Sequence, residues 1–242
     1  MQNPQEGNGF AMMVKEGLKK TLKRIVLWFP EPNYTRPRNL KLFDWMNQNA
    51  PGKIVLNLGS GIGHFDYYLS KEIKLINLDI FPFKKNVDVI GDAHFLPFKN
   101  ECFDIIYSIA VLEHVRKPWI VADEMFRVLH TGGHVVLELP FLNVIHDEHD
   151  YFRFTDKGIL SLFDEKRFDA ILEQVGSGGG SFLSVFFLEY FRQFLPSKYM
   201  KVLWLMTMRY IFFLLKYLDV LVKTSQTLRV TANSFSFIGK KR

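Results

Sequence analysis

Between residues 53 and 140, short apolar runs alternate with longer amphipathic segments, and this alternation limits the fold more than any other feature. Two of the intervening segments, GHFDYYLSKE and PWIVADEMFRVLHTGG, have the periodicity of helices. Strands that alternate with helices form a parallel sheet with helices on both faces. We therefore expect a doubly wound α/β fold, whose first strands are KIVLNLG, KLINLDI, VDVIGDA, CFDIIYS and HVVLELP.

Two further strands complete the expected sheet after residue 150. TDKGILSLFDEK predicts a helix capped by Thr155 or Asp156, and RFDAILEQVGSGGG predicts a strand that runs into a flexible Gly/Ser stretch. The alternating segment TANSFSFIGKK predicts an antiparallel last strand. We expect one seven-stranded domain, residues 41–242, with an apolar helical insertion at about 181–228 and a basic amphipathic extension, residues 1–40, before it.

The composition suits such a domain and limits the classes of partner that it could bind. With 48% hydrophobic residues the chain can bury a large core, and its single cysteine, Cys102, excludes an intramolecular disulfide and fits a reducing compartment. The net charge of +6 is compatible with nucleic acid, anionic lipid or an acidic substrate. Because the basic residues accompany apolar helices and not base-stacking aromatics, the pattern disfavours nucleic acid.

The first strong strand ends in VLNLGSGIGHF, where three glycines occupy alternate positions. A dinucleotide fingerprint would need glycine at position 64, which is His64, and a P-loop would need Gly-Lys-Ser/Thr, which is absent. Asp79 ends the next strand about 20 residues further on, where a carboxylate reads the ribose hydroxyl pair. Together they predict a nucleoside-bearing ligand without a diphosphate. A tight strand–helix turn that holds no ligand is the alternative.

Residues 54–140 resemble the class I S-adenosylmethionine-dependent methyltransferases of type 11. VLNLGSGIGHF is similar to the family's first motif, LINLDI to its second, GDAHFLPFKNECFDIIYSIAVLEHV to the next two, and EMFRVLHTGGHVVLELP to the following helix, turn and strand. The resemblance implies a Rossmann-like fold, S-adenosylmethionine as cofactor and methyl transfer as activity. Asn57 departs from the pattern, because the family usually has Asp there.

The same resemblance implies the cofactor-binding residues, position by position. Asp79 would hold the ribose hydroxyls, and Ile80 would pack near the adenine. Asp92 and Ala93 match the motif in which a carboxylate and a backbone N–H meet the adenine edge. The remaining residues would border the methionine part of the cofactor or line its pocket: Gly59, Ser60, Gly61, Gly63, Ile109 and Ala110.

Methyl transfer to a hydroxyl needs a base, and two stretches of the sequence offer one. His114 follows the fourth strand, at the carboxyl edge where open α/β sheets bind ligands, although a structural role is the alternative. The loop HDEHDYFRFT holds the other candidates, His146, His149 and Asp150.

This loop has three interpretations: a solvated polar loop, a metal site or a substrate-binding loop. Two histidines spaced i, i+3 in a loop with no distant third ligand argue against a metal, so we expect none. The pattern H-x-x-x-D-Y-x-R-x-T resembles one in type-11 methyltransferases associated with cell-surface polysaccharide synthesis. That resemblance implies that Tyr151 and Arg153 contact the substrate, while a structural salt bridge is the alternative for Arg153.

Residues 197–223 are apolar and long enough to cross a bilayer. On a helical wheel, however, Lys201, Arg209, Lys216 and Asp219 fall within an arc of roughly 80°. Spanning would place Arg209 near the middle of the bilayer, whereas a helix in the interface can turn its cationic side to the headgroups. We expect an interfacial helix on an anionic membrane. A dimer contact or pocket lid, and a true span, are the alternatives.

These features favour S-adenosylmethionine-dependent O-methylation of a glycan or lipid-linked saccharide. We expect a cytoplasmic protein, peripheral on the inner face of a membrane, with a homodimer as one further assembly. The alternatives are a lipid or quinone methyltransferase, and a cofactor-binding protein without activity that acts as a partner of membrane enzymes. His64 disfavours a dinucleotide-dependent oxidoreductase.

Overall fold

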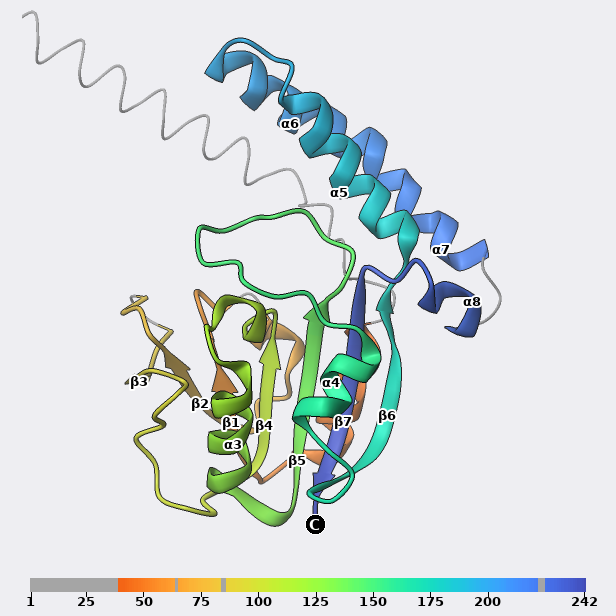
Figure 1. Ribbon diagram of the computed structural model, residues 1–242. Helices are drawn as coiled ribbons and strands as arrows, with labels where there is room; N and C mark the ends of the chain where they lie inside the picture. Colours follow the sequence, from red (N-terminus) through yellow and green to blue (C-terminus); the bar gives the residue numbers. More distant parts are fainter. Residues whose placement is uncertain (1–38, 64, 84–85, 222–224) are drawn as a thin grey trace, which may run out of the picture.

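The computed structural model describes residues 39–63, 65–83, 86–221 and 225–242. Within them one seven-stranded sheet runs through the molecule in the order β3-β2-β1-β4-β5-β7-β6 (Figure 1). Nearly all of the predicted basic extension, residues 1–40, and His64 lie outside the described residues. The strands are β1 (Ile54–Leu58), β2 (Lys74–Asp79), β3 (Val89–Ile90), β4 (Phe103–Ile109), β5 (Leu129–Pro140), β6 (Phe168–Ser177) and β7 (Ser234–Lys241).

The strand directions confirm the predicted fold class. Strands β1 to β5 pair in parallel, whereas β7 is antiparallel to both of its neighbours, β5 and β6. The carboxyl ends of the parallel strands therefore meet along one edge of the sheet, the upper edge in Figure 1. We call this the carboxyl edge; ligands of open α/β sheets bind there.

Helices cover both faces of the sheet (Figure 1). On one face, α3 (Pro118–Val128) and α4 (Asp156–Leu162) bury the larger core, which includes Met125 and Ile159. On the other face, α2 (Asn39–Asn49) buries Leu42 and Met46 against Val55 and Ile105. The hydroxyl of Thr155 accepts a hydrogen bond from the N–H of Gly158 at 3.0 Å, so Thr155, and not Asp156, is the N-cap of α4.

The helix predicted after the glycine turn is largely absent, which corrects the expectation for GHFDYYLSKE. Only a 3-10 turn, η1 (Asp66–Tyr68), forms there. The rings of Phe65 and Tyr68 stack on Phe43 of α2, with centroids 5.8 and 5.2 Å away. Asn47 then bonds to the carbonyl of Tyr68 at 2.9 Å and the N–H of Ser70 at 2.8 Å. These contacts satisfy backbone groups that a helix would otherwise pair internally.

The Gly/Ser stretch that was expected to be flexible begins a helix, α5 (Gly179–Arg192). The carboxylate of Asp219 accepts hydrogen bonds from the N–H groups of Gly178 and Gly180, at 3.1 and 2.7 Å. It therefore occupies the positive end of α5 as a cap supplied from another helix. A Cβ at Gly180 would lie 2.3 Å from the carbonyl oxygen of Leu215, so glycine allows this close approach.

The insertion between β6 and β7 forms a projecting helical arm, which we define as residues 179–221. It consists of α5, α6 (Lys198–Phe212), the 3-10 turn η3 (Phe213–Tyr217) and α7 (Leu218–Leu221), and is followed by α8 (Ser225–Arg229). The arm rises from the carboxyl end of β6, and the turn between α5 and α6 lies at its far end (Figure 1). The indole N–H of Trp204 donates to the carbonyl of Leu188 at 2.9 Å and joins the two helices.

The arm corrects one part of the membrane interpretation. Lys216 is 3% exposed and Asp219 is 9% exposed, so these two residues of the predicted polar stripe face the protein and not headgroups. The ammonium of Lys216 lies 3.7 Å from the ring centroid of Phe213. No described helix has the length and apolar character that crossing a bilayer would require.

Candidate active site

The glycine turn lies at the carboxyl edge, directly after β1. Gly59, Gly61 and Gly63 all have positive φ angles, of 73°, 54° and 76°, which side chains with a Cβ rarely adopt. The N–H groups of Gly59 and Ser60 both donate to the carbonyl of Leu78, at 2.8 and 3.0 Å. The turn is thereby held against the end of β2.

Asp79 joins the glycine turn to β2, as the spacing of the sequence predicts. Its carboxylate is 8% exposed and accepts hydrogen bonds from the N–H groups of Gly61 and Phe81, each at 2.9 Å. Each carboxylate oxygen retains acceptor capacity beyond these bonds. Ile80 is 56% exposed beside it, so an apolar surface stands next to the carboxylate.

The other predicted cofactor residues follow β3 and β4 at the same edge. The N–H of Gly91 donates to the carbonyl of Asp79 at 3.0 Å, which places Asp92 and Ala93 next to the end of β2. Ile109 ends β4, and Ala110 has a φ of 56°, a left-handed conformation that is strained for a residue with a side chain.

Two observations fit a ligand at this turn. The hydroxyl of Ser60 is buried and has no hydrogen-bond partner among the described residues. A Cβ at Gly61 would meet nothing within 4 Å, whereas a Cβ at Gly59 would lie 2.3 Å from Val111. The turn is thus closely packed on the β4 side and open at Gly61, so a nucleoside-bearing group can approach its backbone.

Asn57, which replaces the family's usual Asp, has a carboxylate beside it. Its side-chain amide donates to Asn77 at 2.7 Å and to Asp66 at 3.3 Å. The hydroxyl of Tyr107 also donates to Asp66 at 3.3 Å, and burial raises the pKa of Tyr107, so this hydroxyl stays protonated. The side-chain carboxyl group of Asp66 therefore lies next to position 57. Asp66 was not among the predicted site residues, because a helix was expected over GHFDYYLSKE and only the 3-10 turn η1 forms there.

Two of the predicted bases lie together after β4 and β5. The Nε2 atoms of His114 and His146 are 3.2 Å apart, and their rings meet edge to face. The loop from residue 141 to 155 arches over the carboxyl edge (Figure 1). It carries His146, whose Nε2 thereby meets that of His114. His149 is 61% exposed and contributes only its backbone oxygen, which accepts from Nδ1 of His114 at 2.9 Å.

Glu113 stands under this histidine pair and was not among the predicted site residues. Its side chain is fully buried, and its Oε1 lies 3.8 Å from Nε2 of His114. Neither carboxylate oxygen has a hydrogen-bond partner in the described residues. Burial raises the pKa of Glu113 to about 8. The adjacent Glu113 and His114 are visible in the sequence, but the burial of the Glu113 side chain is not.

Asp150 and Arg153 form an ion pair that shapes the loop. Hydrogen bonds from Arg153 lower the pKa of Asp150 to about 2, so Asp150 is a weak base. The guanidinium makes two contacts with that carboxylate and also donates to the carbonyls of Asn143, Val144 and Phe152. With its donors engaged in this way, Arg153 fits the structural salt bridge that the sequence left as an alternative. Tyr151, 40% exposed, accepts a hydrogen bond from Arg116.

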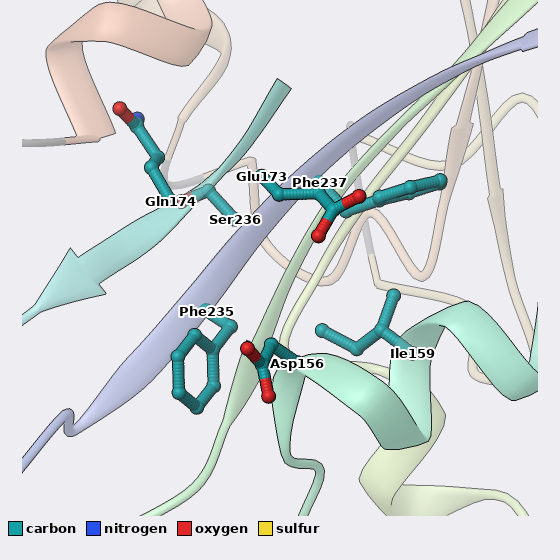
Figure 2. Close-up of a pocket in the computed structure, with 7 residues that line it drawn as sticks. All are labelled: Asp156, Ile159, Glu173, Gln174, Phe235, Ser236 and Phe237. Carbon is teal, nitrogen blue, oxygen red and sulfur yellow. The ribbon is translucent and has the colours of Figure 1, made fainter. Parts of the chain in front are cut away.

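A small pocket lies elsewhere, between α4 and the strands β6 and β7 (Figure 2). Its lining contains none of the predicted site residues: Asp156, Ile159, Glu173, Gln174, Phe235, Ser236 and Phe237. Strands β6 and β7 are at the opposite end of the sheet order from the β1–β2 pair that carries the glycine turn. This pocket is therefore separate from the candidate site.

Comparison with known proteins is consistent with this geometry. Residues 56–137 match the family model described as a methyltransferase domain. The seven-stranded sheet, with β7 antiparallel to its neighbours, is Rossmann-like. An uncharacterized methyltransferase of Mycobacterium leprae is 34% identical over 108 residues, which are 38% of this chain and 40% of that protein. An uncharacterized protein of Methanocaldococcus jannaschii is 35% identical over 97 residues, covering 37% of this chain and 42% of that protein. The chain thus spans about two fifths of each relative.

Solved methyltransferase-like structures share the fold at low sequence identity. A Haloferax volcanii protein, solved with the Trm112 methyltransferase activator, superposes with a TM-score of 0.56 at 15% identity, covering 86% of this chain and 89% of that one. A phosphoethanolamine N-methyltransferase of Haemonchus contortus, solved with S-adenosylhomocysteine, superposes with a TM-score of 0.53 at 16% identity. The match covers 84% of this chain and 52% of that one. The cyclase SpnF superposes with a TM-score of 0.55 at 13% identity, and the match covers 84% of this chain and 79% of that one. The fold alone therefore does not fix the reaction.

Proposed function

We propose that this chain is an S-adenosylmethionine-dependent methyltransferase that methylates an oxygen of a glycan or lipid-linked saccharide at a membrane surface. The hydrogen bond between the N–H of Gly61 and the carboxylate of Asp79 carries the cofactor part of the proposal. It joins a glycine turn without a dinucleotide fingerprint to an acid placed for a ribose. The match of residues 56–137 to a methyltransferase domain supports the same cofactor.

The residues at the carboxyl edge would hold the cofactor through distinct groups. Asp79 would accept hydrogen bonds from the ribose hydroxyls, and Ser60 would use its unpartnered hydroxyl. Asp66 would supply the negative charge that attracts an ammonium, next to Asn57. When bound, the cofactor supplies an electrophilic methyl group, so the protein has mainly to orient the acceptor and remove its proton.

The histidine pair is better suited to that proton transfer than Asp150. Asp150 has a pKa of about 2 and is a weak base, whereas an imidazole nitrogen with a lone pair can accept a proton. His114 lies four residues after the strained Ala110, where the chain leaves β4, and it is partly exposed. We assign acceptor contact and proton removal to His114, with His146 as its neighbour.

The far end of the helical arm supports the membrane part of the proposal. Its exposed rings include Phe194 at 68% and Tyr199 at 88%, next to Leu203 at 63%. Arg192 and Lys198 flank these rings. Aromatic side chains favour the bilayer interface, and cations favour anionic headgroups. This surface also makes a lipid acceptor the second candidate, because the arm rises from the carboxyl edge itself (Figure 1).

Calorimetric titration tests the cofactor directly. We expect the purified chain to bind S-adenosylhomocysteine with micromolar affinity and NADH not at all. Asp79→Ala should weaken S-adenosylhomocysteine binding on the order of 100-fold, because hydrogen bonds to a charged group are lost. Unchanged affinity in that variant, or tighter binding of NADH, would overturn the cofactor assignment. Acceptor oligosaccharides and lipids are then compared with labelled S-adenosylmethionine.

Vesicle sedimentation tests the membrane surface. We expect the full chain to sediment with vesicles that contain phosphatidylglycerol and much less with phosphatidylcholine alone. The double variant Phe194→Glu, Leu203→Glu should lose at least about tenfold in vesicle affinity. Ile171→Glu is the matched control, because Ile171 is 48% exposed on β6, outside the arm. Equal sedimentation of all three proteins, or a dimer that the double variant dissociates without any vesicle binding, would contradict the proposal.

A further inference from the structure

Three potential metal-ligating atoms converge beside the carboxyl edge. One oxygen of Glu113 and one ring nitrogen each of His114 and His146 all lie within 4.8 Å of one another. His114 and Glu113 come from the turn η2 (Leu112–His114), and His146 comes from the loop after β5. The sequence analysis rejected a metal because it found no third ligand for the loop histidines. The fold brings two such ligands from η2.

The outer nitrogen of each ring already has a backbone partner. Nδ1 of His114 is 2.9 Å from the carbonyl of His149, and Nδ1 of His146 is 3.2 Å from the carbonyl of Val144. A carbonyl oxygen only accepts hydrogen bonds, so each Nδ1 carries a proton. In a neutral imidazole the other nitrogen, Nε2, then presents a lone pair. The two Nε2 atoms face each other at 3.2 Å, where two lone pairs repel.

A cation between the rings removes this repulsion. Zinc–imidazole bonds of about 2.0–2.1 Å in a tetrahedral site place two ligating nitrogens about 3.3 Å apart. The observed separation of 3.2 Å matches that geometry. The imidazole orientation matches too, because metal-ligating histidines almost always donate their other N–H to a carbonyl or carboxylate.

Glu113 points independently to a cation. Its side chain is 0% exposed, and both of its oxygens lack a hydrogen-bond partner in the described residues. A buried carboxyl group without a hydrogen-bond partner is costly, and a bound cation would stabilise its ionised form. Its Oε1 lies 3.8 Å from Nε2 of His114, and one of its oxygens lies within 4.8 Å of a ring nitrogen of His146.

We propose that Glu113, His114 and His146 bind one divalent transition-metal ion, Zn²⁺ by preference, with a further coordination position open. Two imidazoles and one carboxylate form a ligand set typical of catalytic zinc sites, which keep a position for water or substrate. Imidazole ligands favour zinc over magnesium, which prefers an all-oxygen shell. Metal binding itself does not depend on the proposed methyl transfer.

The Asp150–Arg153 ion pair gains a role in this site. A carboxylate oxygen of Asp150 lies 3.2 Å from Nδ1 of His146 and also accepts the N–H of residue 146 at 3.2 Å. Arg153 fixes that carboxylate in turn. Asp150 and Arg153 are therefore positioning residues that orient the His146 ring toward the metal.

The location suggests what the ion would do if the proposed function holds. Gly59 of the cofactor turn packs against Val111, which is two residues before Glu113. The open coordination position would thus be close to the cofactor turn. A hydroxyl bound there becomes more acidic and would lose its proton to solvent, so in the metal-bound protein the ion would replace His114 as the group that promotes proton loss, because both nitrogens of His114 are then engaged. This role rests on the proposed function; the metal site does not.

The test measures metal binding without any cofactor. The full chain is stripped with a chelator, dialysed and titrated with Zn²⁺, Mn²⁺ and Mg²⁺ in separate calorimetric experiments. We expect stoichiometric Zn²⁺ binding of micromolar affinity or tighter, and much weaker Mg²⁺ binding. Replacement by Co²⁺ should give the intense visible absorption of a tetrahedral site, which reports coordination directly.

Variants assign the ligands. His114→Ala, His146→Ala and Glu113→Gln should each weaken Zn²⁺ binding at least about 100-fold. His149→Ala is the matched control for metal affinity, since it removes an exposed imidazole of the same loop and keeps the backbone oxygen that His114 uses. Circular dichroism checks that each variant is folded, and a folded Glu113→Gln with lost affinity is decisive if an alanine variant unfolds.

Two outcomes would overturn the proposal. The first is wild-type protein that binds no Zn²⁺ at 100-fold excess while it still binds S-adenosylhomocysteine, which would leave a shared proton between the histidines. The second is Zn²⁺ binding that survives in all three ligand variants, which would place the ion elsewhere. Loss of S-adenosylhomocysteine binding with intact Zn²⁺ binding would instead contradict only the proposed function.

Discussion

The carboxylate of Asp219 lies 2.7 Å from the backbone nitrogen of Gly180 and so ties the last helix of the arm to the start of its first. The same carboxylate accepts hydrogen bonds from the N–H and the hydroxyl of Ser181, at 3.3 and 2.9 Å. A single buried side chain therefore holds together the two ends of the arm, which are about 40 residues apart in the sequence. The base of the arm is thus held by four hydrogen bonds to one carboxylate, while a hydrogen bond from Trp204 to Leu188 joins α5 to α6 further along.

We predict that Asp219→Ala destabilises the protein by at least about 2 kcal/mol, because several buried N–H groups lose their acceptor. Urea denaturation followed by circular dichroism measures the change. Asp169→Ala is the control, since the Asp169 side chain is 54% exposed in its ion pair with Arg242. It should shift the unfolding free energy by no more than about 1 kcal/mol. Equal shifts in the two variants would contradict the capping role.

We predict that Gly59→Ala destabilises the protein more than Gly52→Ala does. Both glycines have positive φ angles, 73° and 76°, so the backbone strain of alanine is alike at the two positions. A Cβ at Gly59 would lie 2.3 Å from Val111, whereas a Cβ at Gly52 meets nothing within 4 Å. The difference should be about 1–3 kcal/mol, the usual cost of overpacking. Thermal unfolding of the two variants provides the measurement. Identical melting temperatures would contradict the prediction and show that the turn shifts to accommodate the new Cβ.

We predict that Asp66→Asn weakens S-adenosylhomocysteine binding about tenfold and leaves the fold intact. The substitution keeps the size of the side chain and removes the charge that stands 3.3 Å from Asn57. Calorimetry compares this variant with Asn57→Asp, which returns the carboxylate to the position usual in the family. We expect the double variant Asn57→Asp, Asp66→Asn to bind nearly as well as the wild type. A double variant as weak as Asp66→Asn would exclude an exchange of charge between the two positions.

We predict an acid-dependent loss of stability from Glu124. Hydrogen bonds from Arg127 hold the pKa of the Glu124 carboxyl below its usual value of 4.5. A carboxyl whose pKa is lower in the folded state contributes stability above its unfolded pKa and loses it as the pH falls through the folded pKa. The unfolding free energy of the wild type should therefore decrease below about pH 4.5. In Glu124→Gln, urea midpoints between pH 5 and pH 3 should change less steeply than in the wild type.

The doubly wound fold and the position of the glycine turn beside Asp79 were predictable because they depend on local patterns. The runs around β1, β2, β4 and β5 are continuous and apolar, which is typical of strands buried on both faces. The glycine turn and Asp79 have a fixed spacing, and the parallel sheet places both at one edge without further information. Thr155 was also identifiable as a helix cap, because its hydroxyl acts on a neighbouring N–H.

The features that sequence missed depend on contacts between distant segments. A 3-10 turn forms in place of the expected helix where Phe65 and Tyr68 stack on α2. The sequence of residues 63–72 alone does not predict this stacking. The burial of Lys216 and Asp219 follows from the packing of η3 and α7 against α5, so a helical wheel of one segment placed them on the exposed side. The burial of Glu113 likewise depends on the loop from residue 141 to 155 closing over η2.

The position of β7 has a consequence for how the protein is made. β6 is at the edge of the sheet, and its neighbour is β7, which the ribosome produces only after the whole helical arm. The strands β1 to β5 can assemble during synthesis, since domains form from their amino-terminal parts first. β6 must wait, unpaired, while the arm with its exposed aromatic rings leaves the ribosome. The nascent chain thus passes through a stage in which the exposed aromatic side chains of the arm are already present while the sheet is still incomplete. A chaperone or a bilayer would bind the chain at this stage.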